Sequence, residues 1–72
     1  MSTYSSLAAL RADAGMTQVE LAKRVGVSQS QIADWERGRN VPSAKSCMRL
    51  ARALGTDPGR IVEAVATRGR GE

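Results

Sequence analysis

Four glycines divide the chain into short stretches of helical apolar spacing. Gly15, Gly26, Gly38 and Gly55 each follow a stretch in which apolar residues recur at intervals of three and four. Such spacing gathers apolar side chains on one face of a helix, and a glycine just beyond it is a common stop signal. The chain has two aromatic residues, no alternating apolar run and no hairpin dipeptide between apolar stretches. The sequence therefore predicts an all-α fold built from short helices.

We predict five helices around one core. The first covers about residues 5–14, and the next three begin at Thr17, Ser28 and Ser43, which are good N-cap residues. Thr17 has Glu20 three residues later, the spacing of a capping box. Thr56 or Asp57 should cap a fifth helix, with Pro58 in its first turn. The side chains expected in the core are Leu7, Leu10, Ala14, Leu21, Ala22, Val25, Ile32, Trp35, Ala44, Cys47, Leu50, Ala51 and Leu54.

The size and composition of the chain restrict its function. Its 72 residues suit one domain over 1–66 followed by a short flexible tail over 67–72. The chain contains no histidine and a single cysteine, so we expect no metal site, no cofactor and no enzymatic activity. The N-terminus does not resemble a signal peptide, and no apolar run is long enough for a membrane span. These features predict a soluble cytoplasmic protein with no membrane partner.

Positive charge is concentrated in one part of the sequence. The chain carries 11 Lys and Arg against 7 Asp and Glu, which gives a net charge of +4. No acidic residue lies between Glu36 and Asp57, whereas five basic residues do. This distribution suits a polyanionic partner such as nucleic acid.

The connection between the second and third predicted helices is very short. Gly26 can take a positive φ in the segment Val25-Gly26-Val27-Ser28, and so turn the chain sharply between two helices. Valines on both sides should anchor the turn, and Ala22 suits a close approach of the helices. The segment TQVELAKRVGVSQSQIADWERGRNVPS resembles the DNA-binding domain of regulators of the lambda-repressor and Cro type, also called the XRE type. The resemblance extends from about Leu7 to Val65 and implies a compact five-helix domain.

The resemblance implies that the helix beginning at Ser28 enters the major groove of double-stranded DNA. Gln29 can form two hydrogen bonds with adenine, and Ser30 can donate or accept a hydrogen bond. Asp34 can accept from cytosine N4 or pair with Arg37, and both interpretations stay open. The implied base-contact residues are Ser28, Gln29, Ser30, Ala33 and Asp34.

Contacts to DNA phosphates are expected beside this helix. Gln18 resembles the glutamine that clamps a backbone phosphate in the family, helped by the start of its helix. The loop after the recognition helix should also pass the DNA backbone. The expected phosphate contacts are Gln18, Arg37, Arg39, Asn40, Ser43 and Lys45. Arg49 and Arg52 are instead interpreted as a solvated basic face.

Three residues receive structural interpretations. Arg11 and Glu36 match an ion pair of the family that joins the first helix to the end of the third. Cys47 lies on the apolar stripe of its helix and is expected to be buried and unreactive.

The chain is expected to lack the second domain of many relatives, so any dimer should form from the helical unit itself. The expected dimer interface is Ile61, Val62 and Val65, with Val19 as a second exposed apolar candidate. These features predict a homodimeric, sequence-specific transcriptional regulator that binds a short palindromic operator. It would be a repressor of the phage Cro type or a restriction–modification controller, and an activator would also touch RNA polymerase. The alternative is an antitoxin-type module that binds DNA and a partner protein.

Overall fold

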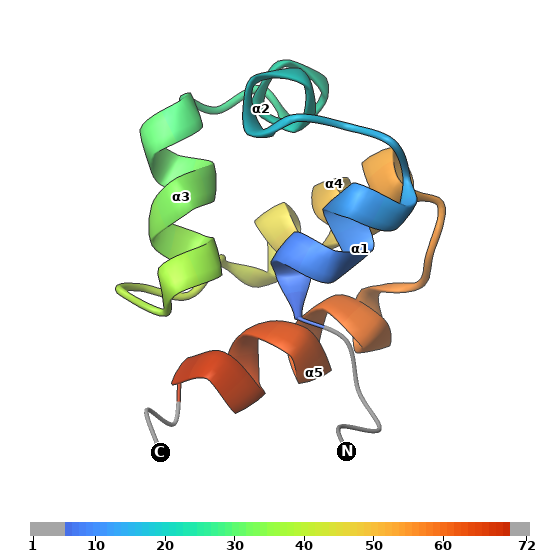
Figure 1. Ribbon diagram of the computed structural model, residues 1–72. Coiled ribbons are helices and arrows are strands. Elements are labelled where there is room, and N and C mark those ends of the chain that lie inside the picture. Colours follow the sequence, from blue (N-terminus) through green and yellow to red (C-terminus); the bar gives the residue numbers. More distant parts are fainter. Residues whose placement is uncertain (1–5, 70–72) are drawn as a thin grey trace.

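The computed structural model describes residues 6–69 and the side chains of residues 6–65. This part of the chain contains five helices and no strand, which confirms the predicted all-α fold (Figure 1). None of the helices combines the length and the apolar character that crossing a membrane requires. The helices are α1 (Leu7–Asp13), α2 (Gln18–Val25), α3 (Gln29–Arg37), α4 (Ala44–Leu54) and α5 (Pro58–Gly69).

Each helix begins at a polar residue that caps it. The hydroxyl groups of Ser6, Thr17, Ser28 and Ser43 each accept a hydrogen bond from the backbone amide three residues later. Asp57 caps α5 in the same way, because its Oδ1 accepts from the amide of Arg60 at 3.0 Å. Thr17 and Glu20 form the predicted capping box. Local chemistry thus determines where the helices start, although α1 begins two residues later than expected.

The core receives side chains from all five helices. Leu21, Ile32, Leu50 and Ile61 have no solvent exposure, and burial of such a side chain contributes about 1.5–3 kcal/mol. The prediction that two small residues are buried in the core is wrong. Ala14 is exposed because it is the C-cap of α1, and Ala44 is exposed because it is the first residue of α4. Leu10 and Leu54 were also predicted in the core; they are only half-buried, but they pack against it.

Helix α5 closes the core from below in Figure 1 and packs against α1, α3 and α4. Ile61 and Val65 are 0% and 4% exposed, together with Ala64 at 2%. Their assignment to a dimer surface is therefore wrong, since these side chains fill the core of their own chain. Val62 lies on the other face of α5 and is 51% exposed. The helix continues through Gly69, so residues 67–69 belong to it and not to the expected tail, and residues 70–72 lie outside the described part.

Candidate nucleic-acid interface

A glycine turn sets the direction of α3 relative to α2. Gly26 has φ +87° and ψ +33°, and its amide donates to the carbonyl oxygen of Ala22 at 2.8 Å. The amide of Val27 donates to the same oxygen at 3.0 Å, and Ser28 then caps α3. A Cβ added at Gly26 would meet only the tip of Arg49, at 3.9 Å. The left-handed backbone, and not a lack of space, is therefore what requires glycine here.

The turn presents one face of α3 to solvent. Ile32 and Trp35 anchor the helix in the core, at 0% and 4% exposure. The opposite face and the start of α2 form a shallow surface pocket of about 280 Å³, which we call the α3 pocket. Its lining residues are Gln18, Gln29, Ser30, Ala33, Asp34 and Arg37.

The α3 pocket brings together four of the five predicted base-contact residues. Ser28 is exposed but does not line the pocket, and its hydroxyl accepts from the amide of Gln31 at 3.1 Å. No ion pair joins Asp34 to Arg37 in the part of the chain that the structure describes. The carboxylate of Asp34 is therefore not neutralised from within its own helix.

A chain of hydrogen bonds orients the two glutamines of this pocket. Gln18 Nε2 donates to Glu36 Oε1 at 3.0 Å, and Gln18 Oε1 accepts from Gln29 Nε2 at 3.2 Å. Gln29 keeps its carbonyl oxygen and its second N–H for another partner, and Gln18 keeps one N–H. Sequence reasoning missed these hydrogen bonds, because it assigned Gln18 and Gln29 to separate roles. A glutamine at the first position of each of two adjoining helices was the signal that could have revealed it.

Arg11 completes the network from α1. Its Nε donates to Glu36 Oε2 at 2.6 Å, its Nη2 to Glu36 Oε1 at 3.3 Å and its Nη1 to the carbonyl oxygen of Met16 at 3.0 Å. The predicted ion pair of Arg11 and Glu36 is thus present. The hydrogen bond to Glu36 raises the pKa of Arg11 above its already high value, so the guanidinium stays charged. The network ties α1, α2 and α3 together beside the α3 pocket.

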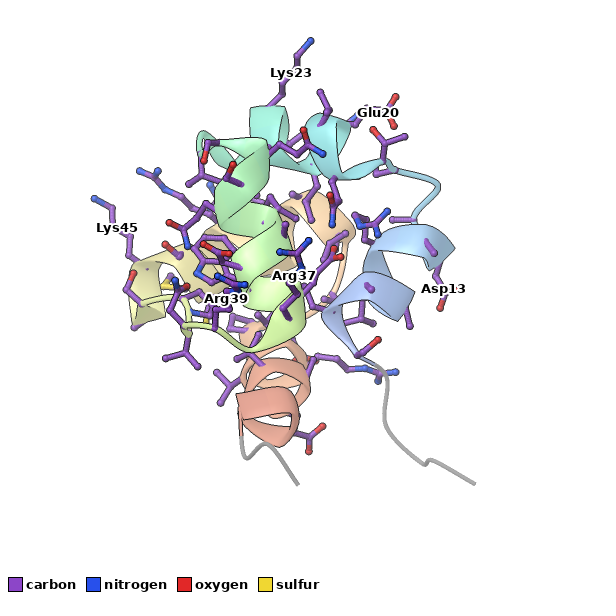
Figure 2. All side chains as sticks on the ribbon, turned by 60° about the vertical axis from the view of Figure 1, so that its left-hand side comes forward. Asp13, Glu20, Lys23, Arg37, Arg39 and Lys45 are labelled. Atoms are coloured by element: carbon purple, nitrogen blue, oxygen red, sulfur yellow. The ribbon has the colours of Figure 1, made fainter. Side chains whose placement is uncertain are left out.

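Apart from the half-buried Gln18, the residues expected to contact phosphates are exposed. Figure 2 shows Arg37 and Arg39 at the end of the helix, Lys45 extending from one side of the molecule, and Asp13 and Glu20 on the opposite side. Asn40 Oδ1 accepts from Gln31 Nε2 at 3.0 Å, which leaves the Asn40 amide nitrogen to donate outward. The hydroxyl of Ser43 is occupied, because it bonds both the amide and the hydroxyl of Ser46. Gln31, to which sequence reasoning gave no role, thus positions Asn40.

The sequence profile of the helix-turn-helix family matches residues 7–61, and this range contains the turn, the α3 pocket and the ion pair. The chain belongs to this family, in its lambda-repressor and Cro type. It is a DNA-binding transcriptional regulator of the helix-turn-helix type.

Curated relatives of this helix-turn-helix regulator come from both cellular organisms and phages. An uncharacterized HTH-type transcriptional regulator of Methanothermobacter thermautotrophicus is 49% identical over 65% of this chain and 68% of its own length. The HTH-type transcriptional regulator y4dJ of Sinorhizobium fredii is 40% identical over 81% of this chain and 75% of its own. The immunity repressor protein of Bacillus phage phi105 is 37% identical over 86% of this chain and 43% of its own. No solved structure matches the chain at a significant level.

The cysteine of this helix-turn-helix regulator lies in its core. Cys47 is 4% exposed, and its thiol donates weakly to the carbonyl oxygen of Pro42 at 3.8 Å. Burial raises the pKa of the thiol, which favours its neutral, unreactive form. The prediction of a buried cysteine is confirmed.

Proposed function

We propose that the chain acts as a homodimeric, sequence-specific regulator of a short, partly palindromic DNA operator. In this proposal the α3 helix of each copy lies in the major groove of one half-site. The observation that carries it is the α3 pocket, in which amide and hydroxyl groups lie beside the cation of Arg37. Uncharged donors and acceptors can read base edges, whereas neighbouring cations can hold phosphates.

The hydrogen-bond chain supports distinct roles for the two glutamines. Gln29 is exposed and keeps one donor and one acceptor, which is what a bidentate pair with adenine needs. Gln18 is half-buried and is held by Glu36, so its remaining N–H suits a fixed phosphate contact. In this proposal Ser28, Ser30, Ala33 and Asp34 complete the base-reading surface. Arg37, Arg39, Asn40 and Lys45 bind the DNA backbone, whereas the hydroxyl of Ser43, also expected there, would first have to release Ser46.

A dimer requires a surface that the folded chain leaves exposed. We place it on the outer face of α5 around Val62, the exposed valine of that helix. Two copies would double the contacts that one small module can make, which raises affinity for a palindrome. The resemblance to an immunity repressor protein supports repression as the outcome of binding. A regulator of this kind acts in the cytoplasm, where its DNA lies.

Selection from random duplex DNA, followed by anisotropy titration, tests this function. The selected operator should contain two half-sites whose centres lie roughly 34–36 Å apart. If each subunit contacts about three to five phosphates, the slope of log K against log salt should be roughly −5 to −9. A slope near zero, or selected sequences without a repeated half-site, would contradict the proposal.

A further inference from the structure

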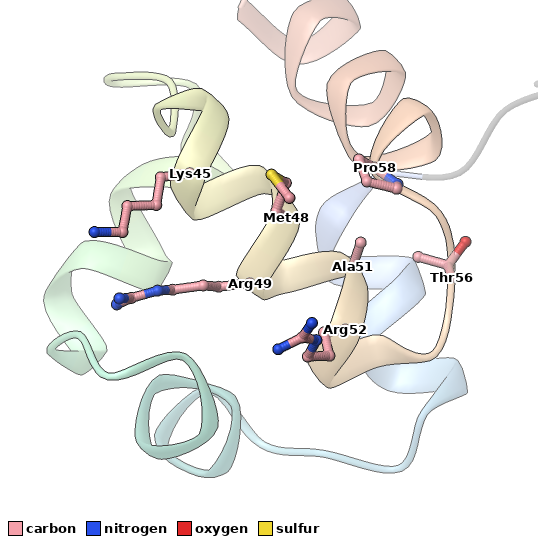
Figure 3. A pocket seen from close by; sticks show the side chains of 7 residues that line it. All are labelled: Lys45, Met48, Arg49, Ala51, Arg52, Thr56 and Pro58. Carbon is pink, nitrogen blue, oxygen red and sulfur yellow. The ribbon is translucent and has the colours of Figure 1, made fainter.

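Helix α4 presents a basic stripe on the face that it turns away from the core. The residues of the stripe lie three, four and seven positions apart, so they share one side of the helix over about 10 Å. Figure 3 shows its three cations extending from the same side of α4. The stripe consists of Lys45, Met48, Arg49 and Arg52.

A surface pocket of about 410 Å³ lies along this stripe, and we call it the α4 pocket. Met48 is 61% exposed within it, and Ala51, Thr56 and Pro58 form the side nearest to α5 (Figure 3). A second hollow shares Arg49 and Arg52 with the α4 pocket and adds Arg24 from the end of α2. The surface therefore combines an apolar centre with a basic rim.

Among the residues that the structure describes, the cations of this rim have no acidic partner. None of Arg24, Lys45, Arg49 and Arg52 forms an ion pair or a side-chain hydrogen bond in the part of the chain that the structure describes. Without these four residues, the positive and negative side chains of the whole sequence would balance. A large share of the positive charge is thus gathered around the α4 pocket and the hollow beside it.

We propose that the α4 pocket docks an acidic, amphipathic segment of a partner protein. An apolar side chain of this segment lies against the exposed Met48 and Pro58, because methionine adapts its shape to an incoming group. Carboxylates of the segment pair with Arg49 and Arg52, whose planar guanidinium groups can bind them through two hydrogen bonds. Charge complementarity selects an acidic partner, and the exposed apolar centre favours a peptide over a phosphate backbone.

The α4 pocket and the α3 pocket have no lining residue in common. Lys45, at the edge of the α4 pocket, is also a proposed phosphate contact, but Met48, Arg49 and Arg52 are not. A partner held by these three residues can therefore occupy α4 while α3 lies on DNA. The regulator could then hold a second protein while it is bound to its operator. This docking site does not depend on the base contacts proposed for α3.

A peptide titration of the full-length, ¹⁵N-labelled chain tests the site. The probe is a helical peptide of about 12 residues, with leucines on one face and glutamates on the other. A control peptide of the same composition has its leucines distributed around the helix. The amide shifts should concentrate at Met48, Arg49 and Arg52 with the first peptide and be much weaker with the control. Equal binding of both peptides, or shifts centred on α3, would overturn the proposal.

Charge reversal with a matched control separates a specific site from general attraction. Arg49→Glu should weaken peptide binding about tenfold, since it replaces a partner of a carboxylate with a repelling charge. Lys23→Glu is the matched control, because it makes the same charge reversal on an exposed residue of α2 that Figure 2 shows pointing away from the molecule. This variant should weaken peptide binding less than about twofold. Arg52→Gln repeats the test without charge reversal, and circular dichroism checks the fold of every variant.

Two competing occupants give different results. If duplex DNA displaces the peptide and shifts the amides of Met48, Arg49 and Arg52, the α4 surface binds nucleic acid and the proposal fails. If the same amides shift with protein concentration alone, a second copy of the chain occupies the pocket and the proposal also fails. If Arg49→Glu and Lys23→Glu weakened peptide binding equally, the binding would depend only on the net charge of the protein, and the proposal of a specific site would fail. Each of these outcomes leaves the operator selection unaffected, so the two proposals fail separately.

Discussion

The guanidinium of Arg11 and the carboxylate of Glu36 form an ion pair with an Nε–Oε2 distance of 2.6 Å, which joins the first helix to the end of the third. The same carboxylate accepts a hydrogen bond from Gln18 at the start of α2. One side chain thus bonds to residues of two other helices, directly beside the surface assigned to DNA. Glu36 is nearly buried, at 8% exposure of its side chain, and Arg11 is 19% exposed.

Glu36→Ala should destabilise the fold. The substitution leaves the Arg11 charge unpaired in a partly buried position and removes the acceptor of Gln18. We expect the free energy of unfolding to fall by about 1–3 kcal/mol, less than for a fully buried pair. Urea denaturation measures the change. Glu63→Ala, on the exposed face of α5, should leave the midpoint almost unchanged, and an equal loss in both variants would contradict a special role for Glu36.

The helix boundaries could be predicted from the sequence because their causes are local. Thr17, Ser28 and Ser43 are N-caps in the structure, as expected, since each hydroxyl bonds an amide only three residues away. The glycine stop at Gly26 is equally local, because it depends on the backbone conformation of a single residue. The α3 pocket followed from these boundaries, since they determine which face of α3 points outward.

The faces of α5 could not be assigned from composition alone. Ile61 and Val62 are adjacent apolar residues, and only packing against α1, α3 and α4 decides which of them is buried. Ile61, Ala64 and Val65 have the spacing of one helical face. Sequence reasoning overlooked the small Ala64 and placed Val62 on the same face as Ile61 and Val65. The bonds of Gln18 were also missed, since they join groups that are up to 18 residues apart in sequence.

Ile61→Asp and Val62→Asp should have opposite consequences. Ile61 is fully buried, so an aspartate there places an unpaired charge in the core and costs more than about 3 kcal/mol. Cooperative thermal unfolding should be lost in a circular dichroism scan. Val62→Asp should keep the melting curve but shift sedimentation toward the monomer, because it charges the proposed dimer surface. A folded, fully dimeric Val62→Asp variant would place the dimer contact elsewhere.

Alkaline pH should destabilise the chain through Cys47. Burial raises the pKa of the thiol above its ordinary value of 9.0, so the unfolded chain loses this proton at lower pH than the folded chain. The free energy of unfolding should therefore be unaffected below that value and fall above it, by at most about 1.4 kcal/mol per pH unit. Urea denaturation between neutral pH and the alkaline range measures the slope. Cys47→Ala should be less stable at neutral pH but show a shallower decline, and identical slopes would exclude the thiol as a cause.

Gln29→Ala and Arg39→Ala should distinguish base reading from phosphate binding. Both side chains are exposed, so neither change should move the melting temperature much. Gln29→Ala removes a bidentate contact, which should cost about 1–3 kcal/mol on the selected operator and relax the choice at one base pair per half-site. Arg39→Ala should weaken binding to all sequences alike and flatten the salt slope by about one unit per half-site.

The bond between the two glutamines makes the Gln29 prediction more specific. Gln18 Oε1 loses its donor in Gln29→Ala, so part of the lost affinity should come from a less fixed phosphate contact. Gln18→Ala combined with Gln29→Ala should then cost less than the sum of the single changes, as expected for groups that share a contact. Anisotropy titrations on the operator and on a scrambled duplex measure all three variants. If Gln29→Ala left base preference intact while Arg39→Ala altered it, the face of α3 assigned to the major groove would be wrong.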